Sequence, residues 1–487
     1  MSAVDIAIIV AYFIGITLFG CSFYWRRGSN DSREFMEGGG RIPGWALALS
    51  IFATYVSSIS FLALPAKAYL TNFNAFVLSL SIPVSGGIAA WLFVPYYRKV
   101  TSASAYADLE RRFGPWARLY ASGCFLVMQS VRSGMILFLL ALLLKTMFGL
   151  SFVTCILVTG VTTIVYSMLG GIKAVVWTDA IQSVILIVGT VVVAVILCCT
   201  LPNGLGNGLT QAWDAGKFSL GSFSLKEWGT ETFWVTFLYG VFLNLQNFGI
   251  DQSYTQRYRA AKTTGAAVRS MFSGAMLYVP VSFGFMFIGT LLWIWSSQHP
   301  GVVPAEVAAR SDAVFPWFIV HRLPVGVSGL LVAAIIAAAM STISGTLNSG
   351  ATVLLEDYRK RFARIVPSER SNVAFLRLAT VGLGVFSVCV ACAVVNIQSV
   401  LTTWWALQSV LSGGMLGLFL LGFFSRRTIR MAAAVATVLG ILTVLWLTFA
   451  PRILGVPVLL HVNLAIVMGT VVLVLSGILL NAVFGAR

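Results

Sequence analysis

Charged residues are scarce in this chain, and acidic ones most of all. Only 10% of the 487 residues are Asp, Glu, Lys or Arg, and only 16 are acidic, whereas 58% are hydrophobic. A soluble domain of this length carries far more charge on its surface. The composition therefore excludes a soluble globular protein and indicates an all-α, polytopic membrane protein.

Several chemical signatures are also missing. Histidine occurs three times, and no cluster of His, Cys and carboxylate residues has the spacing of a metal site. No Gly-Lys-Ser or Gly-Lys-Thr phosphate loop is present. We therefore expect neither an enzyme nor an ATP-driven pump, and the energy for any transport must come from an ion gradient.

Long apolar runs take the place of these signatures. A helix needs about 20 predominantly apolar residues to cross a bilayer. The sequence predicts thirteen such spans, at residues 4–23, 44–70, 74–97, 117–144, 151–169, 173–200, 232–250, 270–296, 326–350, 372–396, 400–424, 429–449 and 460–483.

The basic residues predict how these spans are oriented. With the spans alternating in direction, 24 of the 32 Lys and Arg residues fall on one side, including those of segments 257–269 and 359–377. By the positive-inside rule this side is cytoplasmic, which places the N-terminus outside and the C-terminus inside. The net charge of +16 then reflects topology, and we expect a lipid bilayer rather than nucleic acid as the partner.

Two charged residues, Arg132 and Asp179, lie inside apolar spans. Ions in hydrocarbon are costly, so both are candidates for a functional site. The alternative is that they form an ion pair that only locks helices together. Asp179 also lies only six residues beyond Lys173 and could sit near the membrane interface.

Three spans carry polar clusters that suggest broken or closely packed helices. The segment 53–61 of the second span is rich in hydroxyl groups, and 244–249 of the seventh contains three amides. In transporters with two inverted repeats, the discontinuous helices cross at the binding site. In the ninth span Ser341, Ser344 and Gly345 share one helical face. The alternative reading is that these small residues only allow close helix packing.

Three motifs resemble those of a known family. Gly170–Gln182 resembles the signature of the sodium:solute symporter family, and Gly38–Arg41 and Asp251–Tyr258 match it as well. The resemblance implies a LeuT-type fold with a 5+5 inverted-repeat core, one preceding helix and two following helices. Residues 1–487 would then form a single transport domain, divided into an N-terminal helix (4–23), the first repeat (44–200), the second repeat (232–424) and two C-terminal helices (429–483).

The resemblance also implies a first sodium site. Its ligands would be the carbonyl oxygens of Ala53, Val56 and Ala338 with the hydroxyls of Ser341 and Thr342. Oxygen ligands of this kind suit a hard cation such as sodium, the expected coupling ion.

Within the family, the chain is most similar to bacterial sodium/sialic acid symporters. This similarity implies sodium-coupled import of sialic acid (N-acetylneuraminic acid) or a related sugar acid across the bacterial inner membrane, by alternating access. A guanidinium is well suited to hold the substrate carboxylate. The substrate-binding residues implied are Arg132, Ser57, Ser58, Ser60, Ser79, Phe242 and Asn247.

Two departures from this pattern bear on coupling and substrate. A second sodium site is implied at Asp179, Ser341 and Ser344, but Gly345 stands where a serine is expected, so one or two sodium ions per cycle are open. Ala75 and Ser79 stand at positions where the resemblance leads us to expect an aromatic residue and a glutamine. The pocket would be roomier, and another small carboxylate or a neutral sugar is the alternative substrate. We expect the chain to function as a monomer.

Overall fold

The computed structural model describes residues 2–26, 31–308, 311–365, 367–394, 400–425, 429–455 and 459–485. Within these ranges the secondary structure is helical, apart from an isolated β-bridge between Ile42 and Ala261. Helices satisfy their backbone hydrogen bonds internally, as hydrocarbon requires. The all-helical prediction is therefore confirmed.

The helices comprise α-helices and short 3-10 or π segments, the latter named η. In chain order they are α1 (Ala3–Arg26), α2 (Ser32–Glu37), η1 (Gly38–Gly40), α3 (Gly44–Tyr55), η2 (Ile59–Ala63), α4 (Leu64–Leu70), η3 (Phe73–Phe76), α5 (Val77–Leu80), α6 (Ile82–Ile88), η4 (Ala89–Phe93), α7 (Val94–Lys99), α8 (Ala107–Phe113), α9 (Pro115–Phe148), α10 (Phe152–Cys199), α11 (Leu205–Asp214), α12 (Phe233–Ile250), α13 (Gln252–Ala260), α14 (Thr264–Gln298), α15 (Ala305–Ala308), α16 (Ser311–Arg322), α17 (Val327–Val353), η5 (Leu354–Arg359), α18 (Lys360–Phe362), α19 (Glu369–Ala393), α20 (Val400–Phe424), α21 (Arg430–Leu454), η6 (Val462–Leu464) and α22 (Ala465–Gly485).

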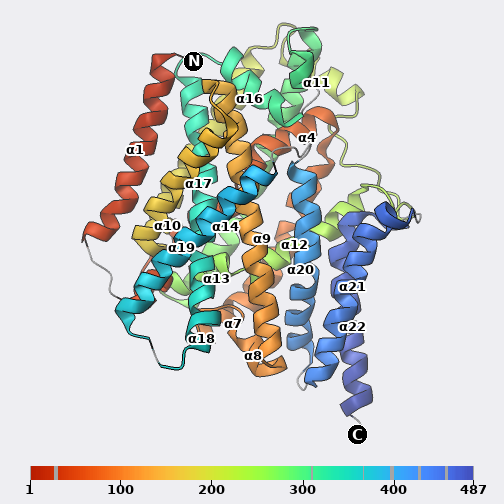
Figure 1. The fold of residues 1–487 in the computed structure, drawn as a ribbon. Helices are drawn as coiled ribbons and strands as arrows, with labels where there is room; N and C mark the ends of the chain where they lie inside the picture. The colour runs from red at the N-terminus through yellow and green to blue at the C-terminus, as the bar shows by residue number, and fades with distance from the viewer. Residues whose placement is uncertain are drawn as a thin grey trace.

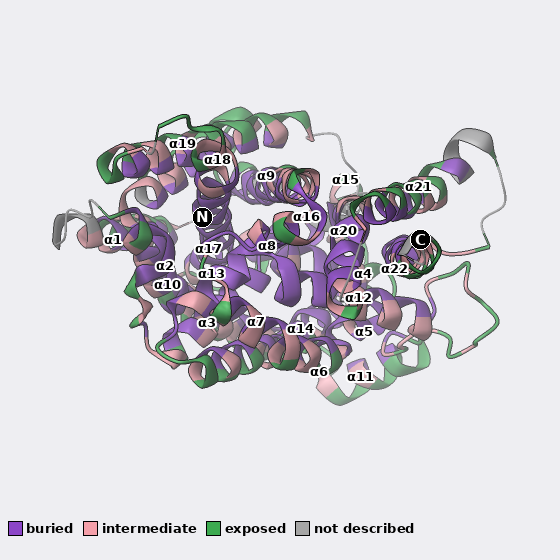
Figure 2. Ribbon diagram, turned by 90° about the horizontal axis from the view of Figure 1, so that it is seen from below, coloured by how far each residue is buried: buried purple, intermediate pink, exposed green. Residues whose placement is uncertain are grey.

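The long helices form a bundle with two distinct ends (Figure 1). The N-terminus, α11 and α16 lie at the end drawn uppermost, called the upper end below, and α8, α18 and the C-terminus lie at the opposite, lower end. Buried residues gather along α17 inside the bundle, and exposed residues line the outer faces of α19 and α21 (Figure 2). The exposed residues of α21 are largely apolar, as expected of a surface that faces lipid.

Fewer helices than the thirteen predicted spans meet the length and hydropathy expected of a membrane span. Ten helices of the described residues are long and apolar enough to cross a membrane, or eleven if the bent pair Gly44–Tyr55 and Ile59–Leu70 is one span. The first part of α10 is a shorter apolar helix, Phe152–Val165, and α12 carries several amides. The chain is a multi-pass helical membrane protein, and thirteen spans stay a prediction.

The predicted spans 151–169 and 173–200 remain two helices, which share the label α10 and are separated by a kink. The bend lies at Gly171, whose φ of 58° and ψ of −166° are non-helical. A Cβ added there would lie 3.0 Å from the carbonyl oxygen of Phe35. Only glycine combines this backbone conformation with so close an approach, so α2 can pack against the bend.

The second predicted span is broken, as its hydroxyl cluster suggested. Helix α3 ends at Tyr55, Val56 is extended, and the chain resumes as a π-helix at Ile59 with a bend of 59°. The last carbonyl groups of α3 therefore lack partners in their own helix. Their oxygens can therefore bind a cation or accept hydrogen bonds from side chains.

The seventh predicted span, 232–250, is continuous, so the break expected among its amides is wrong, and the chain breaks directly after the span. Helix α12 continues through Gly249 to Ile250, and α13 begins at Gln252. Between them Asp251 is extended, and its Oδ1 accepts a hydrogen bond of 2.7 Å from the Ser253 amide. An aspartate favours this N-cap geometry, which places the break at the acid rather than within the run of amides.

Candidate functional site

A cavity lies where the break after α3 meets α12. The Tyr55 hydroxyl at the end of α3 donates to Asn244 of α12, and the Tyr55 ring stacks on Phe248 at 5.5 Å. The space inside the cavity is small, about 60 Å³. The lining residues are Tyr55, Ser57, Ile59, Ser60, Leu64, Ala75, Leu78, Ser79, Arg132, Leu243, Asn247, Tyr278, Leu401, Trp404, Trp405 and Gln408.

Arg132 enters this cavity from α9. Its Nη2 donates to the carbonyl oxygens of Thr54 (3.0 Å) and Tyr55 (3.4 Å), and its Cζ lies 5.9 Å from the centre of the Trp404 ring. No carboxylate of the described residues lies within ion-pair distance, and Nε is buried without a hydrogen-bond partner. The alternative of an ion pair with Asp179 is not found, so the guanidinium retains donors for a ligand.

Four further predicted residues come together around Arg132. Ser57 and Ser60 flank the break of α3, Ser79 lies on α5, and Asn247 lies on α12. The Ser79 hydroxyl is 2.7 Å from that of Ser282, and Asn247 Oδ1 accepts a hydrogen bond of 3.2 Å from Gln408. The cavity wall therefore offers hydroxyl and amide groups next to a positive charge.

Two predicted substrate residues are not part of this wall. Ser58 is fully buried and donates to the carbonyl oxygen of Ile136 at 3.2 Å. Phe242 packs against the hydrophobic core. Adjacent positions of a helical turn point in different directions, so Ser58 faces α9 although Ser57 and Ser60 face the cavity.

The candidate sodium ligands lie between the break of α3 and α17. The Thr342 hydroxyl donates to the carbonyl oxygens of Val56 (2.9 Å) and Ala338 (3.1 Å). Ala53 lies in the last turn of α3, where carbonyl groups lack helical partners. These oxygens fit a hard monovalent cation. Ser341, the fifth residue of the expected set, donates to Asp179 at 2.8 Å.

Asp179 itself sits in a fully buried polar cluster. Its Oδ2 accepts from Ser50 (2.5 Å) and forms an ion pair of 2.8 Å with Arg257 Nη2, while Oδ1 accepts from Ser341. Arg257 is also fully buried. Ser344, expected beside Asp179, donates instead to the carbonyl oxygen of Ser341 at 3.0 Å.

Comparison with known proteins identifies the family. The model of the sodium:solute symporter family matches residues 35–440. The chain belongs to the sodium:solute symporter family. It is therefore a transporter and not an enzyme, and sodium is its coupling ion.

Individual relatives cover nearly the whole chain. The sodium/sialic acid symporter SiaT of Proteus mirabilis is 32% identical over 446 residues, covering 91% of this chain and 89% of that protein. The sodium/sialic acid symporter NanT of Aliivibrio fischeri is 32% identical over 443 residues, 90% of this chain and 86% of that protein. A solved structure, described as a substrate-bound outward-open state of a Na⁺-coupled sialic acid symporter with a novel Na⁺ site, has a TM-score of 0.90 and 29% identity, and covers 99% of this chain and 98% of that one.

Several residues of the symporter's cavity were not predicted from the sequence. They are Tyr278 of α14 and Trp404, Trp405 and Gln408 of α20. Gln408 could have been singled out, because an amide within an apolar span needs a partner. The aromatic residues carry no such signal, since aromatic residues are common throughout this chain.

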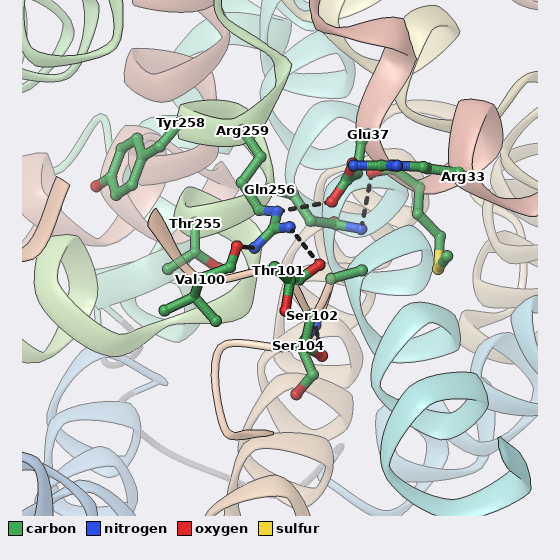
Figure 3. A network of polar contacts seen from close by, with 12 residues as sticks. Arg33, Glu37, Val100, Thr101, Ser102, Ser104, Thr255, Gln256, Tyr258 and Arg259 are labelled. Carbon is green, nitrogen blue, oxygen red and sulfur yellow. Dashed lines mark hydrogen bonds and ion pairs between the residues drawn. The ribbon is translucent and has the colours of Figure 1, made fainter. Parts of the chain in front are cut away.

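A polar network of the symporter links α13 to α2 and to the loop that follows α7 (Figure 3). Arg259 Nε forms an ion pair of 2.7 Å with Glu37, which also pairs with Arg33 at 3.0 Å. The remaining guanidinium nitrogens of Arg259 donate to the carbonyl oxygens of Val100 and Thr101. Helix α13 is therefore held between α2 and the loop that follows α7.

Proposed function

We propose that this chain is a sodium-coupled symporter that imports sialic acid by alternating access, with N-acetylneuraminic acid as the first candidate. The observation that carries the proposal is Arg132, a buried guanidinium on the cavity wall with no carboxylate of its own. A charge in this position favours a substrate that brings the missing anion. The sialic acid symporters of Proteus and Aliivibrio, similar over about nine tenths of the chain, support the same substrate.

Each part of a sialic acid molecule has a suitable partner in the cavity. Arg132 would hold the carboxylate, while Ser57, Ser60, Ser79 and Asn247 would bond to hydroxyl and amide groups. An analogue that lacks the matching hydroxyl or amide groups would lose these hydrogen bonds and should bind more weakly.

Sodium would couple to the substrate through the break in α3. The proposed ligands are the carbonyls of Ala53, Val56 and Ala338 and the hydroxyls of Ser341 and Thr342. A sodium ion there would fasten α17 to the end of α3, whose carbonyls at Thr54 and Tyr55 hold Arg132. Sodium binding would thus order the residue that binds the anion, and each ligand would favour the same conformation.

The finer architecture belongs to this proposal as well. Residues 44–200 and 232–424 would be the two inverted repeats, opened by the broken helices α3 and α12–α13. The lower end would be cytoplasmic, because the basic helices α7 and α18 lie there (Figure 1). The N-terminus would then lie outside a bacterial inner membrane, and one chain would suffice for transport.

A second candidate is a different small carboxylate. Ala75 and Ser79 leave room in the wall that larger side chains would fill. A neutral sugar is disfavoured, because it would leave the Arg132 charge desolvated and uncompensated.

Uptake into proteoliposomes tests the proposal. Labelled N-acetylneuraminic acid should accumulate only with an inward sodium gradient, and unlabelled small carboxylates or neutral sugars should not compete. Ser57→Ala should impair uptake, whereas the adjacent Ser58→Ala should not, because only Ser57 lines the cavity. Sodium-dependent uptake of another carboxylate, with none of sialic acid, would replace the substrate and keep the role of Arg132.

A further inference from the structure

A second, larger cavity lies beside α7, a helix of the lower end (Figure 1). Its volume is about 750 Å³, which is within the range of small-molecule sites. Its walls come from α2 and η1, from the end of α7 and the loop that follows, and from α10 and α13. Three acidic and six basic residues line it, and the basic ones are Arg33, Arg41, Arg98, Lys99, Lys173 and Arg259.

Half of these basic side chains are compensated within the wall. Glu37 forms ion pairs with Arg33 at 3.0 Å and with Arg259 at 2.7 Å. The Lys173 ammonium forms an ion pair with Glu34. These ion pairs hold α2 against α10 and α13, and they leave the other three basic residues of the cavity without a carboxylate of the described residues at ion-pair distance.

The uncompensated residues are Arg41, Arg98 and Lys99, which line the same cavity. Arg98 Nη1 donates to two carbonyl oxygens of segment 259–261, both at 3.0 Å, and its buried Nε has no hydrogen-bond partner. The backbone amide of Ile42, next to Arg41, donates to the same segment at 3.3 Å. Arg41 and Arg98 therefore lie beside one stretch of chain, and their charges, with that of Lys99, need an anion from outside.

Bare backbone forms another part of the wall. The three consecutive glycines Gly38–Gly40 line the cavity, with φ angles of 67°, 73° and 63°. A Cβ at Gly40 would meet no atom within 4 Å, and the nearest atom to a Cβ at Gly39 would be the Lys173 ammonium nitrogen, at 3.7 Å. The backbone of these glycines is therefore open to the cavity, and glycine allows an anion to approach the chain closely.

A phosphate monoester matches this wall better than a carboxylate does. It carries about 1.5 to 2 negative charges near pH 7 and several strong acceptor oxygens, which guanidinium and ammonium groups bind well. We propose that this cavity binds a phosphate monoester, held by Arg41, Arg98 and Lys99. The group belongs to a soluble ester or to a phospholipid headgroup, and in either case it joins η1 to the end of α7. The site does not depend on which substrate the symporter carries.

Titration calorimetry of the purified chain in a neutral detergent, at fixed ionic strength, tests the site. The probes are inorganic phosphate and dioctanoyl phosphatidic acid, and at least one should bind saturably. Arg41→Gln/Lys99→Gln spares the ion pairs of Glu37 and should weaken binding at least about tenfold, through lost charge-assisted hydrogen bonds. Both replaced side chains are exposed, so the variant should fold.

Arg364→Gln/Arg370→Gln is the matched control. It removes the same charge from two exposed residues outside the cavity, between α18 and the first turn of α19, and should bind the probe as the wild type does. Binding of inorganic phosphate assigns the site to soluble esters, and binding of phosphatidic acid alone assigns it to a lipid headgroup, with dioctanoyl phosphatidylcholine as the lipid control.

Four results would overturn the proposal. They are the absence of saturable binding by both probes, binding that Arg41→Gln/Lys99→Gln leaves unchanged, equal losses in the two double variants, and equally tight binding of acetate. The last two results would show a general attraction of anions to a basic surface, which salt screens, rather than a site for phosphate.

Discussion

Two arginines are buried in the core of this molecule, and their surroundings differ in one respect. Arg257 is fully buried and paired with Asp179, whereas Arg132 is 9% exposed and meets only carbonyl oxygens and the face of Trp404. Both guanidinium groups are partly desolvated, but only Arg257 is in ion-pair contact with a carboxylate, whereas the buried Asp251 interacts with Arg132 from beyond ion-pair distance. A buried charge left uncompensated is costly. We infer that Arg257 stabilises the fold, whereas Arg132 is available to bind an external anion.

Removal of Arg132 should have the largest effect on transport. Arg132→Ala should lower sodium-driven sialic acid uptake by at least about 100-fold, the scale on which loss of one partner of a desolvated charge pair is felt. Arg132→Lys keeps the charge but not the two-pronged geometry, and should retain part of the uptake. Initial rates in proteoliposomes provide the measurement. Wild-type uptake by a well-folded Arg132→Ala protein would contradict the contrast between the two arginines.

Removal of Arg257 should act on stability first. Arg257→Ala leaves Asp179 buried without its ion pair and should reduce the free energy of unfolding by about 3–5 kcal/mol. Combining it with Asp179→Asn should recover most of that loss, because no charge remains buried. Melting temperatures in detergent, measured for both single variants and the double variant, give the coupling between the two residues. If the stability losses of the two single variants simply add in the double variant, the ion pair itself contributes nothing to stability.

Substitution of Thr342 tests whether the proposed sodium site adjoins the break of α3 that holds Arg132. Thr342→Val keeps the shape of the side chain but removes the hydroxyl that reaches Val56 and Ala338. We expect a roughly tenfold weaker sodium affinity, equivalent to about 1.4 kcal/mol. Thr342→Ser keeps the hydroxyl and should stay near the wild-type value. The measurement is the sodium concentration that gives half-maximal uptake. Equal values for Thr342→Val and Thr342→Ser would show that the Thr342 hydroxyl does not bind sodium.

The two arginines also mark what sequence could and could not predict. Arg132 stood out because it interrupts an apolar span, and the hydroxyl-rich segment before Pro65 predicted the break in α3. Arg257 lies among basic residues at the end of a span, so its pattern is that of a surface segment. Its burial follows the break at Asp251, between α12 and α13, and the sequence pattern does not show this break.

The same limit applies to the cavity wall. Ser57, Ser58 and Ser60 are equivalent by composition, and only the local geometry of the break directs two of them inward. Trp404 and Tyr278 come from helices far apart in the sequence. Such long-range juxtapositions leave no local pattern.

A third carboxylate–arginine cluster, at the lower end, should respond least of all. Glu110 pairs with Arg361 and, at 3.0 Å, with Arg118, and its side chain is 27% exposed. Burial raises the pKa of Glu110, but the hydrogen bonds from Arg361 and Arg118 outweigh it and hold the pKa below its ordinary value near 4.5. Because the pKa is lowered on folding, this stabilisation is present above about pH 4.5 and is lost as the pH falls through the folded pKa.

Glu110→Gln should therefore cost less than about 1 kcal/mol near pH 7, the usual scale of a solvent-accessible ion pair. Arg118 keeps a second partner, since its Nη2 lies 2.6 Å from Asp357. Melting curves of wild type and variant from pH 7 down to pH 3 should converge as the acid is protonated, and high salt should narrow the gap at neutral pH. A stability loss at neutral pH as large as that of Arg257→Ala would contradict this expectation. The solvent-accessible ion pairs of Glu110 would then contribute as much as the buried pair of Arg257 and Asp179.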